Sequence, residues 1–78
     1  MSEQVIEAMR RAIAARLPEA EIDVAGGAGH YTVTVVCASF EGKGMVECHR
    51  LVYEALAPLM SGPEAPVHAI DRLHTSTP

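Results

Sequence analysis

The chain has 78 residues, with ten acidic and six basic side chains and a formal net charge of −4. Since domains typically hold ~100–200 residues, we expect one small domain over 1–78, with no separate catalytic lobe. The acidic balance argues against a domain whose main task is to bind phosphate backbones, because such domains usually carry a basic patch. No apolar run approaches the ~20 residues of a membrane span, and Glu3 and Glu7 stand where a signal peptide would be apolar and basic.

The first expected element is a helix that has Ser2 as its N-cap and is ended by Pro18. Two strands follow, a short one over 22–25 and a strongly alternating one over 31–37, joined by the glycine-rich segment 26–29. The apolar residues of the helix follow a helical spacing: Val5, Ile6, Met9, Ala12, Ile13 and Leu17.

A turn over 40–44 leads into a second helix, for which Gly44 is the expected N-cap. Because proline cannot continue a regular helix, Pro58 predicts a break or kink near Ala57. The predicted apolar stripe of this helix consists of Met45, His49, Val52, Tyr53, Leu56, Leu59 and Met60.

A loop over 61–66 precedes a third expected strand over 67–73, and the polar tail 74–78 is expected to fray. The order helix, strand, strand, helix, strand predicts a small α/β (α+β) sandwich. The crossover through the second helix makes its two strands parallel. We therefore expect a three-stranded mixed sheet with both helices on one face and the other face partly exposed or kept for a partner.

Two cysteines, Cys37 and Cys48, are too few for a disulfide scaffold. We interpret them as reduced thiols of a cytoplasmic protein. Cys48 precedes His49, but adjacent helical residues point ~100° apart, so the two do not form a nucleophile–base pair. The sequence also shows no pattern that predicts paired buried carboxylates or a Ser–His–Asp triad, so it gives no indication of an enzyme.

Four histidines raise the question of a metal site, because neutral imidazole is a ligand for zinc, copper and iron. No C-x-x-C, H-x-x-x-H or C-x-x-C-H motif is present, so no complete local site is visible. Each histidine also has a simpler interpretation: His30 enters a strand, His49 packs on a helix, His68 ends a sheet and His74 lies in the tail. Incomplete ligands would matter only if a partner supplied the rest.

Gly42-Lys43-Gly44 before a helix, with Arg50 further along, could hold an anion through backbone N–H groups and positive charge. The segment lacks the length of a P-loop and its setting after a strand. Glycines that form a tight turn explain it better.

Several motifs taken together resemble the BolA family. They are F-E-G-K at 40–43, C-H-R-L-V-Y-E-A-L at 48–56, V-H-A at 67–69 and the final T-P. His30-Tyr31, a histidine and an aromatic residue after a glycine-bearing loop, is also similar to the family. The joined pattern covers nearly the whole chain, from the hairpin loop to the C-terminus.

The resemblance implies a fold similar to class II KH domains and a role as a non-enzymatic adaptor. Proteins of this family pair with a monothiol glutaredoxin and share a [2Fe–2S] cluster in iron–sulfur trafficking and iron sensing. The glutaredoxin gives a cysteine and a glutathione thiolate. By this resemblance, His68 and His30 are the ligands from the present chain.

The chain also departs from the family pattern. Gly44 replaces a serine, Cys48 replaces an arginine, and one additional residue before the final Thr-Pro predicts a bulge at Asp71-Arg72. Some family members are described as transcriptional regulators. DNA binding is therefore the alternative function. Lys43 and Arg50 are the residues of the helix–turn–helix-like region that would contact the DNA phosphates, and the net charge of −4 weakens this alternative.

Overall fold

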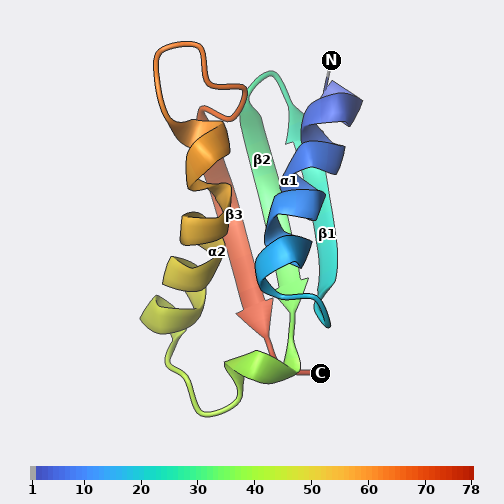
Figure 1. Ribbon diagram of the computed structural model, residues 1–78, viewed down its shortest axis with the longest axis vertical. Coiled ribbons are helices and arrows are strands. Elements are labelled where there is room, and N and C mark those ends of the chain that lie inside the picture. The colour runs from blue at the N-terminus through green and yellow to red at the C-terminus, as the bar shows by residue number, and fades with distance from the viewer. Residues whose placement is uncertain (1) are drawn as a thin grey trace.

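The computed structural model describes residues 2–78. Its elements are α1 (Ser2–Arg16), β1 (Glu21–Gly27), β2 (His30–Val36), the 3₁₀ turn η1 (Ala38–Phe40), α2 (Met45–Met60) and β3 (Ala69–Ser76). The central strand β2 pairs antiparallel with β1 and parallel with β3, which confirms the predicted mixed sheet. Both helices lie on the same side of this sheet (Figure 1). No helix among residues 2–78 is long and apolar enough to cross a membrane.

The core lies between the helices and the alternating strand β2. Tyr31, Val33 and Val35 are buried, whereas the intervening residues of β2 are only partly covered, because successive side chains point to opposite faces of a strand. From the helices, the buried residues are Met9, Ile13, Cys48, Val52, Ala55 and Leu56.

The hairpin between β1 and β2 is tighter than the predicted loop over 26–29. Gly26 and Gly27 still pair with Tyr31 and His30, so β1 extends beyond the expected 22–25 and the turn consists of Ala28 and Gly29 alone. Ala28 has φ 55° and Gly29 has φ 85°. Two central residues with positive φ are typical of the type I′ turn, whose twist matches that of the flanking strands.

Strand β3 lies later in the chain than the predicted 67–73, and the expectation of a frayed tail from His74 is wrong. The segment His74–Ser76 pairs in register with Thr34–Val36 of β2. These polar residues form a strand because the backbone of β2 offers partners for their N–H and C=O groups. The predicted bulge is confirmed: Ile70 pairs with Tyr31 and Arg72 with Thr32, which leaves Asp71 as the extra residue.

Helix α2 corrects two expectations. It continues through Pro58 to Met60, so the break expected near Ala57 is wrong. Pro58 lies in the last turn and has no N–H to donate to the carbonyl of Glu54. Glu54 is exposed, so water can hydrogen-bond to this carbonyl instead. The buried stripe is also rotated from the predicted one. Met45 and Tyr53 are 72% and 41% exposed, and Cys48 and Ala55 are buried instead.

Replacing Pro58 with alanine is therefore expected to stabilise the protein. Proline costs ~3 kcal/mol in a helix interior, and this is offset by about 1 kcal/mol because proline also restricts the unfolded chain. We expect the free energy of unfolding of Pro58→Ala to rise by about 1–2 kcal/mol, measured by urea denaturation. An unchanged or lower value would contradict this view of the last turn. Ala57→Gly, at the neighbouring exposed position, is the control and is expected to destabilise.

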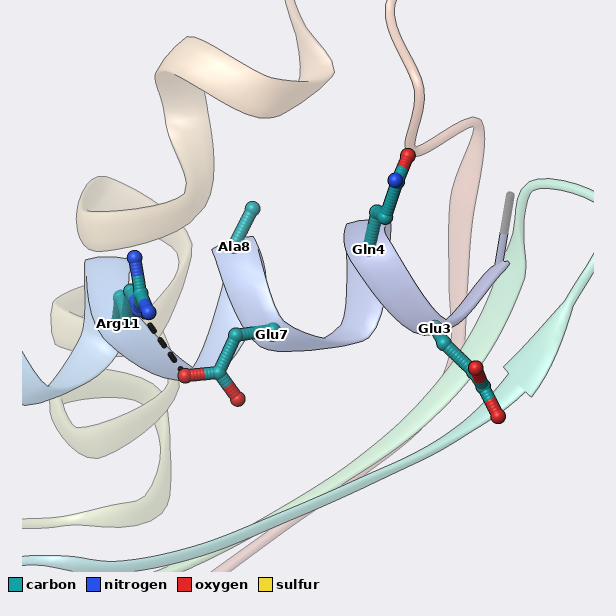
Figure 2. A pocket seen from close by; sticks show the side chains of 5 residues that line it. All are labelled: Glu3, Gln4, Glu7, Ala8 and Arg11. Carbon is teal, nitrogen blue, oxygen red and sulfur yellow. Dashed lines mark hydrogen bonds and ion pairs between the residues drawn. The ribbon is translucent and has the colours of Figure 1, made fainter.

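The outer face of α1 carries a small ion-pair network around Glu7, of which Figure 2 shows the pair with Arg11. Arg11 donates to the Glu7 carboxylate at 3.0 Å, an interaction that the i,i+4 spacing of the two residues favours, and Arg10 also contacts this carboxylate. Hydrogen bonds from Arg10 and then Arg11 hold the pKa of the Glu7 carboxyl below its ordinary value of 4.5.

The lowered pKa of Glu7 gives a pH-dependent contribution to stability. Because the folded state favours the charged form, the contribution is present above pH 4.5 and is lost as the pH falls through the lower pKa of the folded protein. We expect Glu7→Gln to lower the Tm at neutral pH and to approach the wild-type Tm in acid. Thermal unfolding across this range measures the difference. A constant difference, or one equally shown by the control Glu3→Gln, would contradict it.

Candidate metal-binding site

His30 and His68 lie at the same end of the sheet. His30 is the first residue of β2, and its partner in β3 is Ala69, the residue after His68. The prediction that His68 is the second residue of the third strand is wrong, because β3 begins at Ala69. Both histidines are exposed. The parallel pairing of β2 and β3 thus brings the two sequence-predicted ligand residues to neighbouring positions at the amino ends of these strands. Figure 1 shows the two strands side by side and running in the same direction.

The backbone of Gly29, in the hairpin turn, holds His68 in place. Its carbonyl oxygen accepts hydrogen bonds from the N–H groups of His68 at 2.8 Å and Ala69 at 3.0 Å. Gly29 is buried, and a Cβ built on it would lie 1.9 Å from Cδ2 of His68. The imidazole ring therefore packs directly against Gly29, where a Cβ would force the ring to shift. Sequence reasoning missed this contact, and the only signal for it was the glycine-bearing loop before His30.

The entry to β3 is fixed on the other side of His68 as well. Val67 is buried, and its N–H donates to the carbonyl of Leu59 near the end of α2 at 3.1 Å. His68 therefore stands between an apolar anchor and the β3 ladder. Its backbone is well held, while its side chain stays exposed to solvent and available to a ligand.

Asp71 is a site residue that sequence reasoning did not identify. Its Oδ1 lies 3.2 Å from Nδ1 of His30. The side chains of His30 and Asp71 are 58% and 56% exposed, respectively, so the pair lies at the surface rather than in the core. The predicted bulge was the available signal, because a bulge redirects the side chain of its extra residue.

The two imidazoles do not make a metal site by themselves. Within residues 2–78, no group of three or more His, Cys, Asp or Glu side chains is close enough to hold a metal ion. Two exposed imidazoles still fit an iron–sulfur cluster, since two histidines can replace two cysteines on one iron of a [2Fe–2S] centre. The arrangement can complete the coordination of a metal that another molecule also holds.

The other candidate residues lie apart from these histidines. The turn that carries Lys43 follows the carboxyl end of β2, whereas His30 begins that strand. The Lys43 ammonium donates to the carbonyl of Ser39 at 2.9 Å, and Arg50 is exposed on α2. Two shallow surface hollows, one along α1 (Figure 2) and one against β1 and β2, are lined by neither His30 nor His68.

The remaining histidines and the cysteines have structural surroundings. His49 is half-buried on α2, and His74 extends from β3 opposite Thr34. Both cysteines are free and buried, which confirms the expectation of unpaired thiols. The Sγ atom of Cys48 lies 3.9 Å from the carbonyl oxygen of Lys43. Reactive cysteines are at least partly exposed, so the burial of Cys48 is typical of a structural thiol.

These features define a class of small α+β domains with two helices on one face of a three-stranded mixed sheet. A family model described as BolA-like protein matches residues 6–78. The chain therefore belongs to the BolA-like family, as the sequence motifs indicated.

Known proteins support the same assignment. BolA-like protein 1 of Mus musculus is 46% identical over 46 residues, which is 59% of this chain and 31% of that protein. The structure of BolA1 from Arabidopsis thaliana superposes with a TM-score of 0.77 at 28% identity and covers 94% of this chain and 90% of its own. A BolA homologue from Coxiella burnetii gives a TM-score of 0.76 at 33% identity, with coverages of 92% and 88%.

Proposed function

We propose that this chain is a non-enzymatic adaptor that binds a monothiol glutaredoxin and shares a [2Fe–2S] cluster with it. The observation that carries the proposal is the placement of two exposed imidazoles, His30 and His68, at one end of the sheet. The partner's cysteine and a glutathione thiolate would supply the two remaining ligands of the cluster. Such a heterodimer would act in iron–sulfur cluster trafficking, assembly or iron sensing.

The chemistry of the donor atoms supports this role. A neutral imidazole carries no charge, whereas a thiolate is negative, so histidine ligation raises the reduction potential of a [2Fe–2S] centre above that of an all-thiolate one. The residues of this chain bind and orient, and they transfer no group. The two free cysteines fit a reducing compartment, and we propose the cytoplasm.

Anaerobic reconstitution tests this function. The chain is mixed with a monothiol glutaredoxin, glutathione, ferrous iron and sulfide, and the product is followed by size-exclusion chromatography and visible circular dichroism. We expect a heterodimer with a spectrum distinct from that of the glutaredoxin alone. The double variant His30→Ala/His68→Ala should lose this spectrum, and the matched double variant His49→Ala/His74→Ala should keep it. A glutaredoxin spectrum unchanged by the wild-type chain would overturn the proposal.

The alternative function is DNA binding by a transcriptional regulator. Each phosphate contact adds ~0.9 to the slope of log affinity against log salt on duplex DNA. With Lys43 and Arg50 as its only anchors, we expect weak binding to a duplex probe and a slope no steeper than about −2. Fluorescence anisotropy over a salt series measures it. Tight binding with a steep slope that Lys43→Ala and Arg50→Ala each reduce by about one unit would favour the regulator.

A further inference from the structure

The bulge in β3 brings an acidic side chain to one of the two histidines. Ile70 and Arg72 pair with consecutive residues of β2, so Asp71 has no partner of its own in the register. A bulge frees its extra residue from the regular alternation and redirects the side chain. The Asp71 carboxylate reaches Nδ1 of His30 at 3.2 Å.

The direction of this hydrogen bond follows from the chemistry of its partners. An ionised carboxylate only accepts hydrogen bonds, so Nδ1 of His30 must be the donor. A neutral imidazole carries one N–H, and the other ring nitrogen then has the lone pair. Nε2 of His30 is consequently the atom with which this ring can bind a metal, and Asp71 determines which of the two nitrogens it is.

We propose that Asp71 is a positioning residue, which holds His30 as the Nδ1–H tautomer and presents Nε2 to a metal. Histidine ligands in proteins commonly donate their second ring N–H to a carboxylate, which fixes ring orientation and increases ligand basicity. The metal's identity as iron rests on the proposed function. The tautomer and orientation of His30 are properties of this chain alone.

Because the His30–Asp71 pair is exposed, a role of Asp71 in positioning His30 can be distinguished from a role in stabilising the fold. With both side chains more than half exposed, the interaction contributes little to folding. Asp71→Ala is therefore expected to leave the Tm close to that of the wild type while changing the state of the His30 ring. A purely structural role for Asp71 would give the opposite pattern.

Nuclear magnetic resonance of the isolated chain labelled with ¹⁵N-histidine tests the tautomer. The measurement is made in alkaline buffer, in the pH range where the spectrum of His30 no longer changes with pH and the ring is neutral. We expect Nδ1–H at His30 in the wild type, and a shift towards Nε2–H, the form favoured by free histidine, in Asp71→Ala. The control Asp23→Ala, an exposed aspartate on β1, should leave His30 unchanged. Identical His30 tautomers in the wild type and Asp71→Ala would overturn the proposal.

The reconstituted heterodimer gives a second readout. Losing a residue that hydrogen-bonds a metal ligand typically weakens metal binding by about 10–100-fold. We expect the affinity of the heterodimer for its cluster, measured by competition with a chelator, to fall by the same factor in Asp71→Ala. Asp71→Asn keeps an acceptor oxygen and should recover part of this affinity. In a His30→Cys background, which keeps a ligand atom but has no imidazole tautomer to hold, Asp71→Ala should have no added effect. An added effect there would overturn the proposal, since Asp71 would then act independently of His30.

The two proposals fail in different ways. If the wild-type chain assembles no cluster with a glutaredoxin, the proposed function fails, and the tautomer measurement still decides whether Asp71 positions His30. If the cluster forms and His30→Ala removes its spectrum but Asp71→Ala leaves both spectrum and tautomer intact, the function stands and the positioning role is wrong.

Discussion

His68→Ala is expected to remove the shared-cluster spectrum of the heterodimer and to lower cluster retention by more than the 10–100-fold typical of losing a hydrogen bond to a ligand. The effect should be large because the variant removes a donor atom itself, and because the backbone around His68 is fixed by Gly29 and Leu59, which leaves little freedom for a substitute ligand. Iron content and visible circular dichroism after gel filtration measure the loss.

The matched control for this variant is His74→Ala. Both histidines are exposed, and removing either should change the free energy of unfolding by no more than about 0.5 kcal/mol. His74→Ala should retain the wild-type spectrum. His68→Cys should retain a cluster with a lower reduction potential, because a thiolate replaces a neutral ligand. Equal spectra for the wild type and His68→Ala would contradict the assignment of His68.

Gly29→Ala is expected to disturb both stability and the site. Gly29 has φ 85°, and a side chain in this left-handed region costs about 1–2 kcal/mol. The added Cβ would also lie 1.9 Å from Cδ2 of His68, so the imidazole has to move. We therefore expect a lower free energy of unfolding together with at least about tenfold weaker cluster retention in the heterodimer.

Gly42→Ala isolates the contact with His68 from the backbone strain. Gly42 has a similar φ of 79°, but a Cβ there would meet nothing within 4 Å. Denaturation should show strain in both variants, and only Gly29→Ala should impair the cluster. Adding His68→Ala to Gly29→Ala should relieve part of the destabilisation, which a double-mutant cycle measures. Equal cluster retention in Gly29→Ala and Gly42→Ala would show that the packing of His68 on Gly29 is unimportant for binding.

The element order and the sheet were predictable because side-chain patterns report them directly. The alternation of β2 set its buried face. The bulge at Asp71-Arg72 was predicted from the resemblance, because the chain has one residue more than the family pattern near its C-terminus. The strand at His74–Ser76 was not predictable from its polar side chains, because it forms through backbone pairing with β2. The rotation of α2 that exposes Met45 and buries Cys48 depends on packing against the sheet, which the helical period alone does not determine.

The site was predictable in its residues but not in its construction. Motif resemblance singled out His30 and His68, and β2–β3 pairing brings them to one end of the sheet. The contacts of His68 with Gly29 and of His30 with Asp71 join residues far apart in the sequence, so no local pattern could reveal them. The glutaredoxin partner, the cluster and the likeness to class II KH domains stay predictions.

Pulsed electron paramagnetic resonance of the reduced heterodimer tests the central claim most directly. The present chain is labelled with ¹⁵N-histidine and combined with an unlabelled glutaredoxin, so that any ¹⁵N coupling to the cluster must come from this chain. We predict strong ¹⁵N couplings in the wild type and in His74→Ala, and loss of the coupling from His68 in His68→Cys, which retains a cluster. A cluster signal without ¹⁵N coupling would show that the histidines of this chain do not bind the iron.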